Sequence, residues 1–134
     1  IKFKKKIRKK YDLLIYFRKH KNKNYAFPLE FVLSLVKKNF KVVVVGDNLD
    51  IKNVKNFEKI NNHLINKIQS FSRYTIASNE NIYSLFITEC ISNNVKILID
   101  KKNKKNINFF KDKFILINFD NLKEILKLRR ITKN

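Results

Sequence analysis

Two short segments of this 134-residue chain carry side chains that could bind a phosphorylated ligand. The first contains Arg18 and Lys23, which follow an apolar stretch with the pattern of a buried strand. The second contains Glu80 and Glu89, which flank a position where a helix should begin. Arginine binds phosphate through a bidentate fork, lysine adds a point charge, and a carboxylate accepts hydrogen bonds from sugar hydroxyls. These residue types together are suited to holding a nucleoside diphosphate.

The second segment has the pattern of a strand, a loop, a helix and a second strand. Its parts are an apolar run at 74–77, a polar loop at 78–83, a helix capped by Ser84 that runs to about Asn93, and an apolar run at 96–99. The expected helix therefore starts just beyond the carboxyl end of a strand, which is where ligands bind in open α/β sheets. Free backbone N–H groups at a helix start favour an anion, usually a phosphate.

Apolar and amphipathic segments alternate along the rest of the chain. The β-branched run at 41–45 is typical of a central parallel strand that is covered on both faces. Strands are also expected at 12–17, 54–57 and 114–117, helices at 29–38 (with Pro28 in the first turn) and 61–70, a polar crossover at 103–108, and a last helix capped by Asp120 that runs to about Leu128.

This alternation predicts a parallel sheet with right-handed crossovers, in a Rossmann-like three-layer α/β domain. Since the carboxyl ends of parallel strands share one edge of the sheet, the two chemical segments should face one crevice. Gly46 is the only glycine of the chain. The G-x-G-x-x-G fingerprint and the P-loop are therefore absent, which argues against binding of NAD or FAD and against a P-loop site.

The two segments resemble motifs of the C-terminal, donor-binding domain of GT-B glycosyltransferases, in the retaining group that includes many bacterial sugar transferases. The family pattern G-R-L-x-x-x-K-G corresponds to YFRKHKNKN, and the pattern E-G-F-G-L-x-x-x-E-A-x-A-x-G-x-P-V-I corresponds to ENIYSLFITECISNNVKIL. The resemblance covers roughly residues 12–120. It implies the C-terminal half of a GT-B enzyme that transfers a sugar from a UDP- or GDP-sugar to a glycan or lipid acceptor, with an N-terminal acceptor domain as its partner.

The resemblance also implies a role for each matching residue. The second glutamate of the family motif, here Glu89, usually binds the ribose hydroxyls, and the first, here Glu80, lies near the donor sugar. The implied catalytic residues are Arg18, Lys23 and Glu80, and the implied nucleotide-binding residues are Arg18, Lys23, Tyr83, Ser84, Leu85 and Glu89. No metal and no cofactor are implied, because protein cations stand in for the divalent ion in a metal-independent enzyme of this kind.

The chain departs from the family pattern in the spacing of the glutamates and at single positions. The two glutamates are one residue further apart than usual, so either the loop is longer or Asn81 takes the place of the first one. The glycine before the arginine is Phe17, and the family proline is Lys96. The glycine after the helix is Asn94, which is the next-best residue for a left-handed C-cap.

The formal charge of +20 raises the alternative of a basic nucleic-acid-binding domain without catalysis. We discount this charge as a sign of nucleic-acid binding. Lys, Asn and Ile fill the positions that tolerate many residues, which is the composition expected of an ordinary protein encoded by an AT-rich genome. No RNP-like motif or helix-turn-helix pattern is present, so no specific nucleic-acid partner is expected. A second alternative is a non-catalytic α/β domain used for protein contact. Some excess charge should remain functional, since phosphate ligands and an anionic membrane surface both favour it.

The remaining features bound the organisation of the chain. At this length we expect one domain, with a basic lead-in or linker at 1–10, the nucleotide-sugar-binding domain at 11–128 and a basic tail at 129–134. The start lacks Met, which suggests a fragment of a longer protein. No apolar run of membrane-spanning length and no signal peptide are visible, which predicts a cytoplasmic protein or one at the inner face of the membrane. Single residues of interest are Cys90, expected to be a small buried hydrophobe, and His20 and His63, expected to have surface or structural roles.

Overall fold

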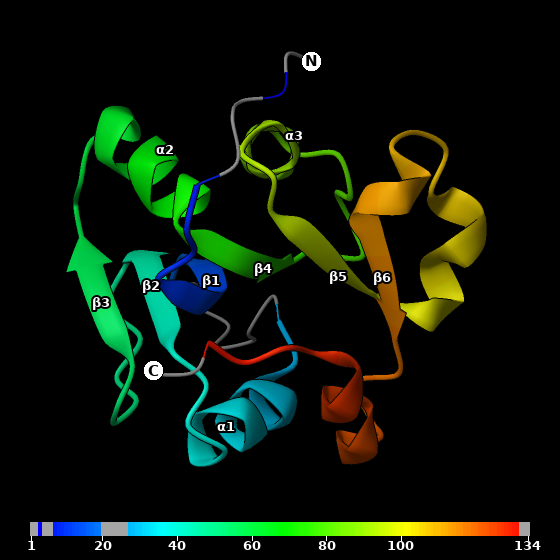
Figure 1. Ribbon diagram of the computed structural model, residues 1–134, viewed down its shortest axis with the longest axis horizontal. Helices are drawn as coiled ribbons and strands as arrows, with labels where there is room; N and C mark the ends of the chain where they lie inside the picture. The colour runs from blue at the N-terminus through cyan, green and yellow to red at the C-terminus, as the bar shows by residue number, and fades with distance from the viewer. Residues whose placement is uncertain (1–2, 4–6, 20–26, 132–134) are drawn as a thin grey trace.

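The computed structural model describes residues 3, 7–19 and 27–131. Its strands form one six-stranded parallel sheet with the order β3-β2-β1-β4-β5-β6 (Figure 1). The strands are β1 (Tyr11–Phe17), β2 (Val42–Gly46), β3 (Lys55–Glu58), β4 (Ser72–Ile76), β5 (Lys96–Asp100) and β6 (Phe114–Ile117). This is the strand order of a doubly wound sheet. The predicted Rossmann-like α/β fold with a parallel sheet is therefore confirmed.

Helices cover both faces of the sheet and complete three layers (Figure 1). Helices α2 and α3 contact each other on one face, and α1 contacts the 3-10 helix η3 on the other. The helices are α1 (Leu29–Lys37), α2 (Asn62–Ser70) and α3 (Leu85–Ser92), with 3-10 helices η1 (Lys101–Asn106), η2 (Lys111–Lys113) and η3 (Leu122–Lys127).

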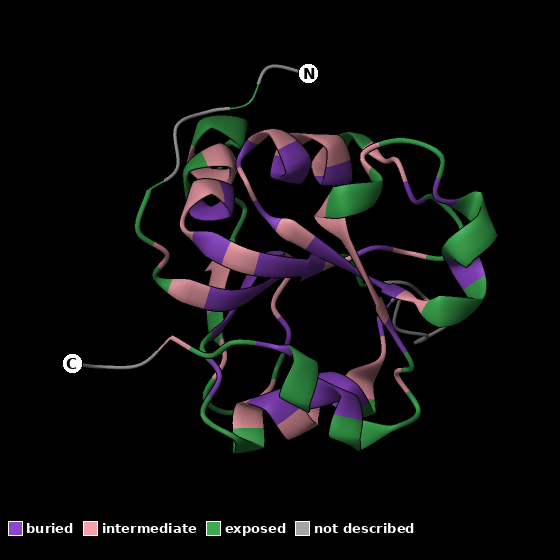
Figure 2. Ribbon diagram, turned by 45° about the vertical axis from the view of Figure 1, so that its right-hand side comes forward, coloured by how far each residue is buried: buried purple, intermediate pink, exposed green. Residues whose placement is uncertain are grey.

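The sheet separates two hydrophobic cores. Along β1, Leu13 belongs to the core under α1 and η3, whereas its neighbour Leu14 belongs to the core under α2 and α3. Figure 2 shows the strands largely buried between helices whose outer faces are exposed. Phe31 and Leu35 of α1 are fully buried against the first core. Each such side chain stabilises the fold by roughly 1.5–3 kcal/mol.

Helix α3 begins at the predicted cap, Ser84, and α2 begins at a side-chain cap, Asn61, that the sequence analysis did not single out. The Ser84 hydroxyl accepts a hydrogen bond from the Ile87 amide at 3.2 Å, and the Asn61 side chain accepts one from the Leu64 amide at 2.9 Å. Each cap satisfies a backbone N–H group that has no partner within the helix. Both helix starts are thereby fixed at the carboxyl edge of the sheet.

Asparagine closes two of the helices in the place that glycine usually takes. Asn39 after α1 and Asn94 after α3 have φ of 66° and 62°. The Val95 amide then donates to the Cys90 carbonyl at 3.0 Å, as in a Schellman motif. The expected left-handed C-cap at Asn94 is confirmed, and Asn39 repeats it in a chain with one glycine.

The last predicted helix differs from the structure in type and in cap. The segment is a 3-10 helix, η3, and Asn121 rather than Asp120 caps it by accepting a hydrogen bond from the Lys123 amide at 3.1 Å. The Asp120 amide instead donates to the Asn118 side chain at 3.2 Å, so Asp120 belongs to the turn that precedes the helix. A helix is thus present where it was predicted, in the tighter 3-10 form, and the cap at Asp120 was wrong because local side-chain bonds place Asp120 before the helix.

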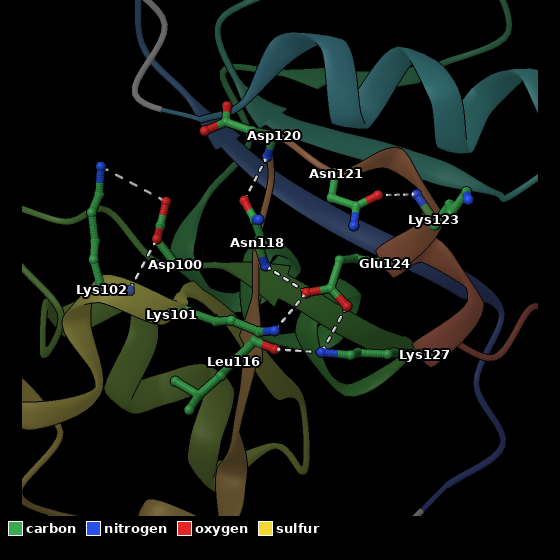
Figure 3. A network of polar contacts seen from close by, with 10 residues as sticks. All are labelled: Asp100, Lys101, Lys102, Leu116, Asn118, Asp120, Asn121, Lys123, Glu124 and Lys127. Atoms are coloured by element: carbon green, nitrogen blue, oxygen red, sulfur yellow. Dashed lines mark hydrogen bonds and ion pairs between the residues drawn. The ribbon is translucent and has the colours of Figure 1, made fainter.

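A carboxylate from η3 joins the ends of β5 and β6 (Figure 3). Glu124 is 8% exposed, and it accepts a hydrogen bond from the Asn118 amide at 2.9 Å. The ammonium groups of Lys127 and Lys101 lie 2.7 and 3.1 Å from its oxygens. The bond from Lys127, followed by those from Asn118 and Lys101, lowers the pKa of Glu124 from 4.5 to about 2.

The segment expected to be a basic tail, 129–134, begins with residues that are held by the domain. Asp12 is buried at the amino edge of β1, and its two carboxylate oxygens accept hydrogen bonds from the backbone. The donors are the Lys41 amide at 2.7 Å and the Ile131 amide at 2.5 Å. The chain therefore continues to pack on the sheet as far as Ile131, and residues 132–134 lie outside the described part.

Candidate functional site

A cleft of about 770 Å³ lies at the carboxyl edge of the sheet. The ends of β1, β2 and β4, the segment before α2 and the first turns of α3 line it. Strands β1 and β4 are neighbours, but their connections lead to opposite sides of the sheet. Ligands of open α/β sheets bind at such a switch point. The cleft is therefore the site where the predicted residues should be sought.

Four residues of the predicted site come together in this cleft, although they belong to segments far apart in the sequence. They are Arg18, Ser84, Leu85 and Glu89. Lys23, the second predicted cation, lies outside the described residues, as does His20. Glu80 and Tyr83 are described but do not line the cleft.

Arg18 follows β1 directly and is exposed at the mouth of the cleft. Its Nε donates a hydrogen bond to the Tyr16 hydroxyl at 2.8 Å, and its guanidinium carbon lies 5.4 Å from the centre of the Tyr16 ring. The hydrogen bond to Tyr16 raises the pKa of Arg18, with a smaller contribution from the Asp47 carboxylate. A permanently charged group with a defined orientation thus faces the site.

The start of α3 presents backbone donors to the same cleft. Ser84 uses its hydroxyl as the helix cap, so its side chain is already engaged. Among the described residues, the amides of Leu85 and Phe86 have no acceptor. The Leu85 side chain is 77% exposed and leaves this helix end open. The position suits an anion, which would gain both hydrogen bonds and the helix dipole.

Glu89 lies on α3, on the side that faces α2. Its Oε2 accepts a hydrogen bond from the Asn66 side chain at 3.1 Å, and Oδ1 of Asn66 accepts one from the Asn93 side chain at 3.0 Å. The carboxylate is half-buried and lines the cleft. A carboxylate has about four lone-pair sites, so the bond from Asn66 leaves it able to accept further hydrogen bonds from a ligand.

The loop before α3 places the two residues considered for the first acidic position differently. Glu80 is exposed and outside the lining, whereas Asn81 lines the cleft. Of the two residues considered for the first position of the motif, Asn81 is therefore the one that lies at the cleft. An amide in that place can still donate and accept hydrogen bonds, but it carries no charge.

Tyr83 points to a neighbouring loop. Its hydroxyl accepts hydrogen bonds from the amides of Asn108 and Phe109, at 3.0 and 2.8 Å, and donates to the Phe109 carbonyl at 2.7 Å. Its ring also packs edge-on against Phe109 and Phe114. Tyr83 thus fixes the loop that follows η1, and its placement gives it no contact with the cleft.

Several lining residues were not singled out from the sequence. Asp47 follows β2, and its Oδ2 accepts a hydrogen bond from the Lys19 amide at 2.8 Å. The pair Gly46-Asp47 at the end of a buried β-branched run was a usable signal, because that run had to end at the same edge. Lys59 has no comparable signal, since it is one lysine among many. Among the described residues, the charged groups of the lining are the cations Arg18 and Lys59 and the carboxylates Asp47 and Glu89.

Cys90 takes no part in this chemistry. It is fully buried in the core between the sheet and α3, as expected. Burial raises the pKa of its thiol well above the ordinary value. The thiol is therefore unreactive at neutral pH. His63 is exposed at the start of α2.

No family model, curated protein or solved structure matches this sequence. Among the residues that the structure describes, no helix is long and apolar enough to cross a membrane. Across the same residues, no three metal-binding side chains of His, Cys, Asp or Glu gather at one point.

Proposed function

We propose that this chain is the donor-binding domain of a GT-B-type glycosyltransferase, and that its cleft binds a UDP- or GDP-sugar. The observation that carries the proposal is the meeting of Arg18, the open N-terminus of α3 and Glu89 in one cleft at the switch point. These groups offer a cation and backbone donors for a diphosphate, and an acceptor for ribose hydroxyls.

The charged groups of the cleft favour binding of a specific small ligand over general binding of polyanions such as nucleic acids. Among the described residues, the carboxylates Asp47 and Glu89 line the cleft beside two cations, although the whole chain has a net charge of +20. A surface for nucleic-acid backbones would be dense in lysine and free of carboxylates. A nucleotide sugar combines phosphates with hydroxyl groups, so it matches a lining of both signs.

In the proposed reaction, the bond between the sugar and the diphosphate breaks while the sugar is transferred to an acceptor hydroxyl. Arg18, together with Lys23, stabilises the negative charge that grows on the departing diphosphate. Glu89 orients the ribose. Asn81 or Glu80 holds the donor sugar, and Asn81 is the one of the two that lines the cleft. These protein cations take the role that a divalent ion has in other transferases, so the proposed reaction is metal-independent.

The acceptor side of the reaction belongs to a second domain in this proposal. A glycan or a lipid-linked acceptor would bind to an N-terminal domain that faces the carboxyl edge of the sheet. The protein would act in the cytoplasm or at the inner face of a membrane, in the biosynthesis of cell-envelope glycans. The basic surface would assist peripheral contact with anionic lipids.

The proposal is tested by calorimetric titration of the 134-residue chain with UDP and with GDP at moderate ionic strength. Arg18→Ala should weaken binding by about 1.5–3 kcal/mol, as loss of a charge-assisted hydrogen bond does. Arg8→Ala is the matched control, because Arg8 is exposed and lies outside the cleft. It should leave the affinity unchanged.

Glu89→Gln separates the donor site from a purely electrostatic one. Removal of a negative charge should strengthen any site that only attracts phosphate, but it should weaken a site in which the carboxylate holds the ribose. A short single-stranded oligonucleotide serves as the competing ligand. The proposal fails if neither nucleotide binds, if Arg8→Ala and Arg18→Ala have equal effects, or if Glu89→Gln tightens binding of UDP and GDP.

A further inference from the structure

Tyr16 is an exposed tyrosine at the carboxyl end of β1. Its hydroxyl forms a hydrogen bond, and its ring packs against another aromatic ring. The side chain is 37% exposed and lines the cleft. Its hydroxyl accepts the hydrogen bond from Arg18 Nε at 2.8 Å. Its ring lies 5.1 Å from the ring of Phe86, with 59° between the two planes.

The contact with Tyr16 orients the donors of Arg18. A guanidinium has five N–H groups, and the bond from Nε uses one of them. Among the described residues, the four N–H groups on the two terminal nitrogens have no acceptor. These are the groups that form a bidentate fork to a phosphate. An unrestrained arginine side chain has high rotamer entropy, and the Tyr16 contact removes part of it before a ligand arrives.

The contact with Phe86 relates this fork to the helix N-terminus. Phe86 is the second residue of α3, and its amide is one of the two open donors described above. The ring pair therefore joins the end of β1 to the start of α3 across the switch point. Tyr16 thus contacts both the arginine that carries the fork and a residue of the open helix turn.

We infer that Tyr16 is a positioning residue that preorganises Arg18 toward a diphosphate in the cleft, acting through its hydroxyl and through its ring contact with Phe86. The inference rests on the proposed function, since it assigns to Tyr16 a part in binding the same ligand. Tyr16 itself need not touch the ligand. Its effect on affinity should be transmitted entirely by Arg18.

Tyr16→Phe tests the hydroxyl while it keeps the ring contact. Calorimetric titration with UDP and GDP should show an affinity about 3- to 10-fold lower than that of the parent, with an unchanged melting temperature. In an Arg18→Ala background, Tyr16→Phe should have no further effect, because the group that it positions is gone. Tyr11→Phe is the matched control on the same strand, at the opposite edge of the sheet.

A second measurement does not depend on a nucleotide. The Nε–H proton of Arg18, followed by nitrogen-15 NMR, should exchange slowly with water in the parent and at least several-fold faster in Tyr16→Phe. Slow exchange that Tyr16→Phe abolishes supports the ordering of Arg18. Equal exchange rates in the two proteins would overturn it.

The two ideas fail in different ways. If Arg18→Ala loses UDP and GDP binding while Tyr16→Phe binds like the parent, the inference about Tyr16 is wrong and the proposed function stands. If additive losses appear in the double variant, Tyr16 contacts the ligand directly and its positioning role is wrong. If the parent binds neither nucleotide, the proposed function is wrong, and the role of Tyr16 in diphosphate binding falls with it even where the exchange rates differ.

Discussion

Gly46 lies so close to Phe17 that a Cβ atom on Gly46 would be 2.3 Å from the Phe17 carbonyl oxygen. The two residues are partners in the pairing of β1 and β2 at the carboxyl edge. Gly46 also has a φ of +106°, which side chains rarely adopt. The single glycine of the chain is thus required where two strands end at the cleft.

Gly46→Ala should destabilise the fold by about 1–3 kcal/mol, because it adds a steric clash to backbone strain. Urea unfolding followed by circular dichroism measures this change. Asn53→Ala is the control, since Asn53 is exposed with a φ of 66° and tests the strain alone. A loss no larger than that of Asn53→Ala would show that the contact with Phe17 relaxes freely.

Asn94→Val should destabilise the fold by about 1 kcal/mol or more, because a β-branched residue is strained in the left-handed conformation. Asn94→Gly should be neutral or slightly stabilising. Asn39→Val repeats the test after α1, where the same conformation is present. Thermal melting curves of the variants give the comparison. A valine variant as stable as the parent would contradict the C-cap geometry.

Glu124 should make the stability of the fold sensitive to acid. Its pKa falls from 4.5 to about 2 in the folded state, so its contribution is complete above pH 4.5 and is lost as the pH falls toward 2. Glu124→Gln should lower stability at pH 7, and it should flatten the decline between pH 4.5 and 2. Urea unfolding at several pH values measures both effects.

The matched control for Glu124 is Glu80→Gln, which removes an exposed carboxylate without a described ion pair. Its pH profile should follow that of the parent. If the two variants have the same profile, the contacts of Glu124 with Lys101 and Lys127 contribute nothing to stability.

Lys9 connects the ends of two helices at the amino edge of the sheet. Its ammonium group donates to the Ser70 carbonyl at 3.0 Å and to the Asn93 carbonyl at 3.3 Å, at the C-terminal ends of α2 and α3. Lys9→Met should destabilise the fold by about 1 kcal/mol, because it removes a cation from two helix C-termini. Lys52→Met, at an exposed lysine, should have no effect in the same melting experiment.

The contacts of Lys9 show that the basic lead-in predicted at residues 1–10 does not lie wholly outside the fold. At least its last part belongs to the fold, since the Lys10 amide also donates to the Phe71 carbonyl at 2.7 Å. Part of the high positive charge thus neutralises helix dipoles at the amino edge. If the Lys9→Met and Lys52→Met variants have the same melting temperature, Lys9 does not stabilise the fold by neutralising helix dipoles.

Local patterns in the sequence determined the elements of this fold. The run at 41–45 is apolar and β-branched throughout, so it had to be buried on both faces, and it became β2. Ser84 could be identified as a cap, and Asn94 as a left-handed C-cap, because both effects depend on neighbours within a few residues. Parallel pairing then required the strand ends to share one edge, which brought Arg18 and Glu89 to one cleft.

Only the tertiary structure decided how side chains from different segments meet. The sequence could not show that the Asn66 side chain reaches Glu89, or that the Tyr16 ring contacts Phe86, because such contacts depend on how α2 and α3 pack on the sheet. The placement of Asn81 rather than Glu80 in the lining also depends on the path of the loop. The sequence did not determine that path, because the spacing of the two glutamates differs from the family pattern by one residue. Secondary structure is set by short-range periodicity, whereas a binding site is set by long-range packing.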